Sequence, residues 1–186
     1  MEHSIALVTG ATSGLGRAAA RLLAEEGWRE IIITGRSLAQ VQETAKQLVA
    51  ETKREVFSPL ELDLDKPLSV QSALAELVKR GQPLDFLLLN AGMVPGKARV
   101  ITAAGIEASQ APLIGHHQLT MGLLRGQLLS ANARIVIASA EPARGGVPMF
   151  KYTDAAPFAR KCFAGDQTAA VEALIRNGPH VKYSPN

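Results

Sequence analysis

Hydrophobic residues in the first 139 positions fall into short apolar runs, separated by longer amphipathic segments rich in helix-forming residues. The short runs are rich in β-branched residues and contain few polar ones, as is typical of strands buried on both faces of a sheet. They predict strands at residues 5–9, 30–34, 56–62, 84–89 and 135–137, of which the third is weakened by Pro59. The longer segments predict helices at residues 14–26, 38–51, 67–80 and 112–130.

This alternation predicts an α/β protein with a doubly wound, Rossmann-type parallel sheet that is covered by helices on both faces. Right-handed crossovers return each strand to the same sheet. After residue 139 prolines recur and no further β-branched run follows. We therefore expect a core at residues 1–139 with five strands, the later strands of such a sheet being missing. Residues 140–186 are expected to be a loop-rich part of the same domain, with one short helix that begins after Asp166.

Composition excludes several classes of protein. The 186 residues, 47% hydrophobic and 20% charged, suit one folded domain. The formal net charge of +3 comes from scattered residues, so we expect no nucleic-acid partner and no basic membrane-binding surface. No apolar run approaches the roughly 20 residues that span a bilayer, and the N-terminus lacks the features of a signal peptide. We therefore expect a cytoplasmic protein with no membrane span.

A glycine-rich turn, Gly10-Ala-Thr-Ser-Gly-Leu-Gly16, lies between the first predicted strand and the first helix. Glycines permit a tight turn and a close approach of backbone and ligand. The free amides at the helix start attract a pyrophosphate, to which Thr12 and Ser13 can donate hydroxyl hydrogen bonds. A plain structural turn is the alternative. The strand–turn–helix context favours nucleotide binding and makes residues 1–139 a dinucleotide-binding core.

The spacing Thr9-Gly10-x-x-x-Gly14-x-Gly16 resembles the short-chain dehydrogenase/reductase family. Three later motifs follow in the family's order: Asp63-Leu64-Asp65, Asn90-Ala91-Gly92, and Arg134 to Ser139. Residues 102–107, 115–116 and 119–120 look like its retinol-dehydrogenase-like and protochlorophyllide-reductase-like branch. The resemblance covers about residues 4–140. It implies the strand order 3-2-1-4-5-6-7, a nicotinamide cofactor, and hydride transfer to or from a small-molecule carbonyl or alcohol.

The same resemblance implies which residues bind the cofactor: Gly10, Thr12, Ser13, Gly14, Leu15 and Gly16 in the turn, Asp63 and Leu64 near the adenine, and Asn90, Ala91 and Gly92 after the fourth strand. Asp63 has a nearly equal alternative as a turn or helix-capping residue. Asn90 can also brace neighbouring strand ends, and the family combines both roles.

The residue after the second strand bears on cofactor choice. NAD-binding folds of this type usually carry an acidic residue there, whereas this chain has Arg36. Its guanidinium can form two parallel hydrogen bonds to a 2′-phosphate and can stack on adenine. We therefore expect NADP(H) in preference to NAD(H). The alternative is that Arg36 is a solvated residue at a helix entrance.

In the resembling family the proton donor is a tyrosine, followed four residues later by a lysine; a serine and an asparagine assist. Ser139 fits the serine, although Ala140 occupies the neighbouring position that the family often uses, and a plain strand-end hydroxyl is the alternative. The asparagine position is Pro112. Tyr152 stands at a suitable distance from Ser139 but has Ala156 four residues on. We interpret Tyr152 as a loop aromatic rather than a catalytic acid.

No Tyr-x-x-x-Lys pair occurs, so we expect a C-terminally incomplete member of the family. Two rival hypotheses remain: a non-catalytic dinucleotide-binding or regulatory protein, and an interaction protein that completes its sheet with a partner strand. The fifth strand would be an apolar edge, which tends to pair with another chain. The long helix near 112–130 suits a homo-oligomer interface, and a buried core helix is the equal alternative.

His116 and His117 are neighbours in the predicted long helix. Adjacent helical positions point about 100° apart, so the two imidazoles cannot form the one-turn pair of a helical metal site. We expect packing or a helix-face role for them, and no metal.

Overall fold

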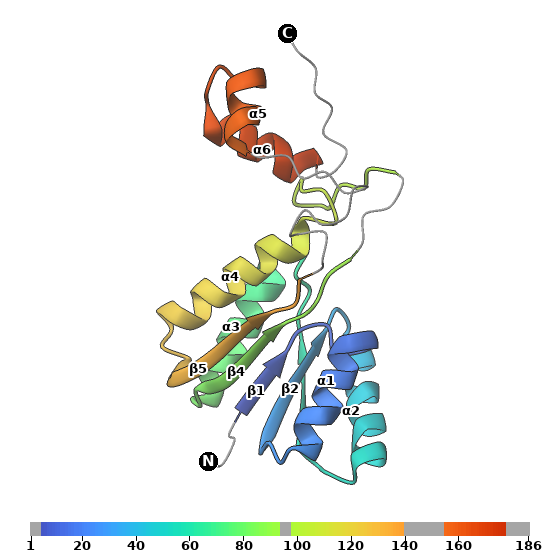
Figure 1. Ribbon diagram of the computed structural model, residues 1–186. Coiled ribbons are helices and arrows are strands. Elements are labelled where there is room, and N and C mark those ends of the chain that lie inside the picture. Colours follow the sequence, from blue (N-terminus) through green and yellow to red (C-terminus); the bar gives the residue numbers. More distant parts are fainter. Residues whose placement is uncertain (1–4, 94–97, 140–154, 178–186) are drawn as a thin grey trace. The chain divides into compact units, whose positions relative to one another are not determined.

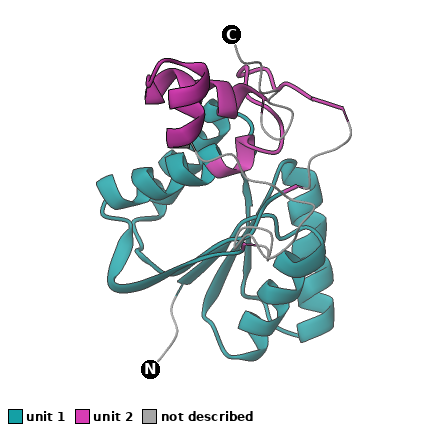
Figure 2. Ribbon diagram, turned by 45° about the horizontal axis from the view of Figure 1, so that its top comes forward, with its two compact units in different colours: residues 1–92, 114–138 teal, residues 93–113, 139–186 magenta. Residues whose placement is uncertain are grey.

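The computed structural model describes residues 5–93, 98–139 and 155–177. Its contacts divide the chain into two compact units (Figure 2). Unit 1 comprises residues 1–92 and 114–138, and unit 2 comprises residues 93–113 and 139–186. No helix of the described ranges is long and apolar enough to cross a membrane.

Unit 1 contains a parallel sheet of five strands in the order β3-β2-β1-β4-β5, which confirms the expected fold class and strand order. The strands are β1 (Ile5–Val8), β2 (Glu30–Gly35), β3 (Phe57–Glu61), β4 (Leu84–Leu89) and β5 (Leu129–Ile137). Pro59 is tolerated within β3 because this strand lies at the edge of the sheet and pairs with β2 alone, so one side needs no backbone donor.

Two helices cover each face of the sheet, with α1 (Gly14–Glu25) and α2 (Leu38–Thr52) on one side (Figure 1). The helices α3 (Pro67–Arg80) and α4 (Ala111–Arg125) lie on the other side. Successive strand residues alternate between two cores, since Ile31 and Ile33 belong to one cluster and Ile32 to the other. Pro67 at the start of α3 and the left-handed Gly81 at its end set the helix bounds that the sequence predicts.

The boundary between α4 and β5 differs from the prediction. The helix does not extend to residue 130 but ends at Arg125, and β5 begins at Leu129 rather than near residue 135. Gln127 adopts a left-handed conformation with φ of 51°, which turns the chain. Leu128 then enters the core, and its carbonyl accepts a hydrogen bond of 2.8 Å from the Leu84 amide. The turn has a local signal, since Arg125-Gly126-Gln127 interrupts the apolar residues with a basic residue and a glycine, and the predicted helix to residue 130 passes over it.

The second edge of the sheet is β5, as expected from the sequence. Its apolar residues Ile135, Val136 and Ile137 are 40%, 43% and 66% exposed. Within α4, Leu119 and Leu123 are fully buried in the core beneath the sheet. These contacts support the core-helix alternative for α4, and homo-oligomer formation through this helix stays a prediction.

Unit 2 contains the helices α5 (Ala155–Cys162) and α6 (Gln167–Asn177), which pack through Phe158, Ala159 and Ala170. The prediction of a single short helix after residue 139 is wrong, because α5 precedes the predicted one. Pro157 does not prevent α5, since it lies in the first helical turn, where the missing N–H has no acceptor to lose. Asp166 caps α6 as expected, with its Oδ1 accepting a hydrogen bond of 3.0 Å from the Ala169 amide.

Candidate functional site

The predicted cofactor-binding segments of unit 1 all follow the carboxyl ends of its strands. The glycine turn follows β1, Arg36 follows β2, Asp63 follows β3 and Asn90 follows β4. Parallel strands bring these ends to one edge of the sheet, which is where open α/β sheets bind ligands. The structure therefore gathers four of the predicted segments, separated by up to 80 positions in sequence, along one edge.

Close backbone approach explains two glycines of the turn. Gly10 has a left-handed φ of 65°, and a Cβ there would lie 2.9 Å from the Ala91 Cα. A Cβ on Gly16 would lie 2.4 Å from the Gly10 carbonyl oxygen and 2.5 Å from Nδ2 of Asn90. The turn, the start of α1 and the segment after β4 thus touch at distances that admit no side chain.

The N-terminus of α1 has unused hydrogen-bonding capacity. Ser13 is the N-cap residue in extended conformation, and its side chain makes no capping hydrogen bond. The first-turn amides of a helix have no acceptor within the helix, and the helix dipole adds partial positive charge there. Leu15 in this turn is 81% exposed. This arrangement can bind an anionic group and an apolar surface beside it.

Asn90 braces two strand ends, as one interpretation of the sequence predicts. Its amide N–H donates to the Thr9 hydroxyl oxygen at 2.8 Å, and its side-chain Nδ2 donates to the Thr9 carbonyl at 3.1 Å. The Ala91 amide also donates to the Thr9 hydroxyl, at 3.0 Å. These bonds tie the segment after β4 to the end of β1.

Arg36 is exposed and forms no salt bridge with any described residue. Burial and the neighbouring Asp63 raise the pKa of Asp65, and the positive charge of Arg36 partly offsets this rise. Among the described residues, the guanidinium is therefore an exposed cation without a salt-bridge partner, at the edge that contains the glycine turn.

Asp63 is buried and its carboxylate already has partners. Oδ1 accepts a hydrogen bond of 3.2 Å from the Asp65 amide, and Oδ2 lies 2.9 Å from the ammonium of Lys66. These are the contacts of a turn residue, which was one of the two interpretations. The neighbouring Leu64 has its side chain in the core. The helix α4 passes close to the Leu64 backbone, since a Cβ on Gly115 would lie 2.4 Å from the Leu64 carbonyl oxygen.

Two of the three positions considered for catalysis, Ser139 and Pro112, lie among the described residues. Ser139 is exposed and follows Ala138, whose amide still pairs with the Leu89 carbonyl at 3.0 Å. Pro112 lies in the first turn of α4, a position compatible with its missing N–H. Tyr152 lies outside the described residues.

His116 is the polar residue whose contact the sequence did not reveal. Its Nε2 lies 2.8 Å from Oγ1 of Thr9, although the two residues are 107 positions apart. Burial lowers the pKa of His116 to about 4. No local signal predicts this pairing, because it depends on α4 packing beside the end of β1. His117 is exposed, as a neighbour about 100° away on the helix should be.

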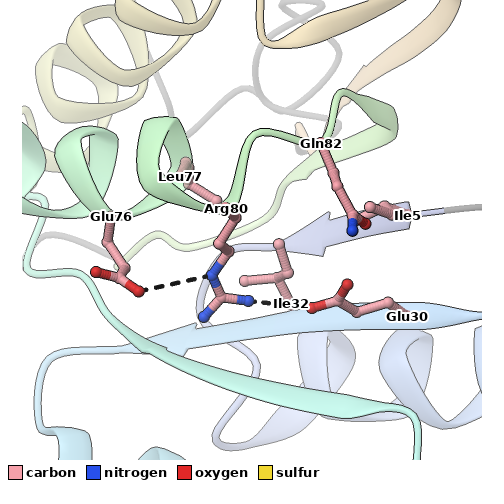
Figure 3. Close-up of a pocket in the computed structure, with 7 residues that line it drawn as sticks. All are labelled: Ile5, Glu30, Ile32, Glu76, Leu77, Arg80 and Gln82. Atoms are coloured by element: carbon pink, nitrogen blue, oxygen red, sulfur yellow. Dashed lines mark hydrogen bonds and ion pairs between the residues drawn. The ribbon is translucent and has the colours of Figure 1, made fainter.

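A small pocket of about 270 Å³ lies among described residues at the beginnings of β1 and β2 and the end of α3 (Figure 3). Arg80 extends between two carboxylates there and bonds Oε1 of Glu30 at 3.0 Å. Gln82 accepts a hydrogen bond of 3.3 Å from Arg29. Because its charges are paired and it adjoins the amino ends of the strands, we do not regard this pocket as the functional site.

Comparison with known proteins agrees with this geometry. The sequence matches the short chain dehydrogenase family over residues 4–165. Oxidoreductase fscI of Fusarium equiseti is 37% identical over 68% of this chain and 50% of its own length. An NADP-dependent 3-hydroxy acid dehydrogenase of Schizosaccharomyces pombe is 36% identical over 54% of this chain and 39% of its own. The chloroplastic protochlorophyllide reductase of Cucumis sativus is 35% identical over 63% of this chain and 30% of its own length.

Solved structures show the same fold. A short chain dehydrogenase from Shigella flexneri, complexed with NADP, is 27% identical with a TM-score of 0.62, covering 81% of this chain and 64% of its own. A short chain dehydrogenase from Escherichia coli CFT073, complexed with NADPH, is 27% identical with a TM-score of 0.61. The match covers 79% of this chain and 62% of the other. The chain thus spans half or less of these three curated relatives. By sequence and by fold, it belongs to the short chain dehydrogenase family of oxidoreductases.

Proposed function

We propose that this protein is an NADP(H)-dependent oxidoreductase that transfers a hydride to or from a carbonyl or alcohol substrate. The observation that carries the cofactor preference is the exposed guanidinium of Arg36 directly after β2, which forms no salt bridge with a described residue, at a position where an acidic residue would repel a 2′-phosphate. The NADP and NADPH complexes of the related structures support it.

The residues at the carboxyl edge fit such a cofactor. The pyrophosphate would bind at the turn and the first amides of α1, with Thr12 and Ser13 as hydroxyl donors and Leu15 as an apolar contact. Gly10 and Gly16 allow the backbone segments to approach closely, and Gly14, with a left-handed φ of 55°, leaves open space beside the turn. Adenine would lie near Asp63 and Leu64, and the nicotinamide half near Asn90, Ala91 and Gly92. When bound, the cofactor would supply the hydride in carbonyl reduction and accept it in alcohol oxidation.

The chain's own contribution to the chemistry is a hydroxyl donor. We propose that Ser139 donates a hydrogen bond to the substrate oxygen, which favours the negative charge that develops there during carbonyl reduction. A proton donor is also required. Tyr152 lacks the lysine four residues later that the family pairs with its tyrosine, so we do not assign this role to it.

Replacing Arg36 with alanine tests the cofactor preference. Charge-assisted hydrogen bonds contribute about 1.5–3 kcal/mol, so Arg36→Ala should weaken NADPH binding about 10- to 100-fold. NADH binding should change less than about three-fold, because NADH has no 2′-phosphate. Dissociation constants from nicotinamide fluorescence check this. Arg21→Ala, at an exposed arginine of α1 paired with Glu25, is the matched control. Equal losses for NADPH and NADH would remove the 2′-phosphate role of Arg36.

A second candidate function is a non-catalytic dinucleotide-binding protein. Pro112 favours it, because it stands where the family has a relay asparagine and offers no side-chain hydrogen bond. NADPH oxidation in the presence of a panel of aldehydes and ketones separates the two. Tight NADPH binding without oxidation by any member of the panel would favour the non-catalytic protein.

A further inference from the structure

The Thr9 hydroxyl lies at the centre of a buried polar cluster that joins the ends of β1 and β4 to α4. Its Oγ1 has four polar neighbours: the amides of Asn90 at 2.8 Å and Ala91 at 3.0 Å, Nε2 of His116 at 2.8 Å, and the Leu88 carbonyl oxygen at 3.3 Å. Thr9 is fully buried and His116 is 7% exposed. Bulk water is therefore a poor substitute for any of these partners.

Counting protons assigns a direction to each bond. A hydroxyl has one hydrogen to donate and two lone pairs to accept with. The backbone amides of Asn90 and Ala91 can only donate, so they occupy both lone pairs. The single hydroxyl hydrogen must then go to either His116 or the Leu88 carbonyl. The 2.8 Å contact with Nε2 has normal hydrogen-bond length, whereas 3.3 Å is long for an O–H donor, and the Leu88 carbonyl already accepts from the Thr9 amide at 3.0 Å.

The imidazole of His116 must therefore present an unprotonated Nε2 to Thr9 and carry its hydrogen on Nδ1. A protonated Nε2 would be a third donor aimed at an oxygen with two lone pairs. The lowered pKa of His116 agrees with this state, because burial keeps the ring neutral at neutral pH. Among the described residues, burial is the cause of that shift.

We propose that His116 is a positioning residue that acts through Thr9: by accepting the hydroxyl hydrogen, it orients both oxygen lone pairs toward the Asn90 and Ala91 amides. The backbone of this segment is thereby held at the edge where the proposed function places the nicotinamide half of the cofactor, and to that extent the inference rests on the proposed function. Without an acceptor at position 116, the hydroxyl hydrogen turns toward the Leu88 carbonyl. The lone pairs then rotate away from one of the two amides.

Two substitutions separate hydrogen bonding from packing. His116→Phe keeps a flat ring of similar size but removes the acceptor, and His116→Gln keeps an acceptor oxygen near the position of Nε2. The neighbouring His117→Phe is the matched control, since His117 is exposed on the same helix. The measured quantities are the hydrogen-exchange rates of the Asn90 and Ala91 amides in the full chain without cofactor, and the affinity for NADPH.

With His116→Phe we expect the two amides to exchange about five- to ten-fold faster and NADPH to bind about five-fold more weakly, as the loss of about one hydrogen bond implies. His116→Gln should restore both quantities, and His117→Phe should change neither. Unchanged amide exchange in His116→Phe, or equal acceleration in His116→Gln, would overturn the positioning role.

A measurement on the unaltered protein keeps the inference testable even if His116→Phe does not fold. Nitrogen-15 spectra of the His116 ring at neutral pH should show hydrogen on Nδ1 and none on Nε2, and the reverse would overturn the assignment. Neither this spectrum nor the exchange rates need a cofactor. A failure of the unaltered protein to bind NADPH would therefore refute the proposed function, while these two measurements still decide the role of His116.

Discussion

The Gly16→Ala substitution is expected to lower the free energy of unfolding by about 3 kcal/mol, the upper range for overpacking a rigid site, and to abolish NADPH binding. The added Cβ would lie 2.4 Å from a backbone oxygen of Gly10 and 2.5 Å from Nδ2 of Asn90. Neither neighbour can retreat easily, because Gly10 is itself pressed against Ala91 and Asn90 is bonded twice to Thr9. The start of α1 must then shift away from the turn that is proposed to bind the pyrophosphate.

Urea unfolding and fluorescence titration with NADPH measure these two effects. Gly92→Ala is the control for stability, since a Cβ there would first meet an atom at 3.9 Å, an ordinary contact distance. Its free energy of unfolding should match that of the unaltered protein. A stable Gly16→Ala variant with undiminished NADPH affinity would show that the close approach of turn and helix is not needed for either property.

A second large effect is expected in the pH dependence of stability. The pKa of His116 is about 4 in the folded chain and about 6.5 when exposed. Between these values the unfolded chain binds a proton that the folded chain does not, so stability falls as the pH is lowered. This contribution is absent above pH 6.5 and reaches about 3 kcal/mol of lost stability near pH 4.

His116→Gln isolates this contribution, because glutamine does not titrate while the other groups of the chain still do. The free energy of unfolding of each protein would be measured by urea at intervals from pH 7.5 to pH 4. The unaltered protein should lose about 3 kcal/mol relative to His116→Gln over this range. A constant difference between the two proteins would mean that His116 is protonated as readily in the folded chain as in the unfolded one.

Most elements of unit 1 could be predicted because their signals are local. Pro67 and Gly81 bound α3, and the β-branched run 30–34 is apolar enough to form a strand within any buried sheet. The prediction failed at the end of α4, because it extends the helix past Arg125-Gly126-Gln127 to residue 130. There the choice between helix and strand depends on the pairing of β5 with β4, a contact between residues distant in sequence.

The candidate site also has features that local sequence predicts and features that it does not. The glycine turn could be predicted from the sequence because a tight turn needs glycine. The role of Arg36 toward a 2′-phosphate stays a prediction, based on its place after the second strand. Two interpretations of Asp63 could not be separated by the sequence alone. Its contacts with the Asp65 amide and Lys66 show the turn role, while its contact with adenine stays a prediction.

The order of apolar runs and glycines along this chain is sufficient to specify a Rossmann-type sheet and the edge at which we propose that the nucleotide binds, since strand burial and tight turns depend on residues close together in sequence. Local sequence does not determine the partner of a buried polar group. Thr9 and His116 meet across 107 positions only because α4 packs against the sheet, with Gly115 allowing it to approach Leu64. Side-chain hydrogen bonds of this kind depend on distances of a few tenths of an ångström, which packing sets and local sequence does not.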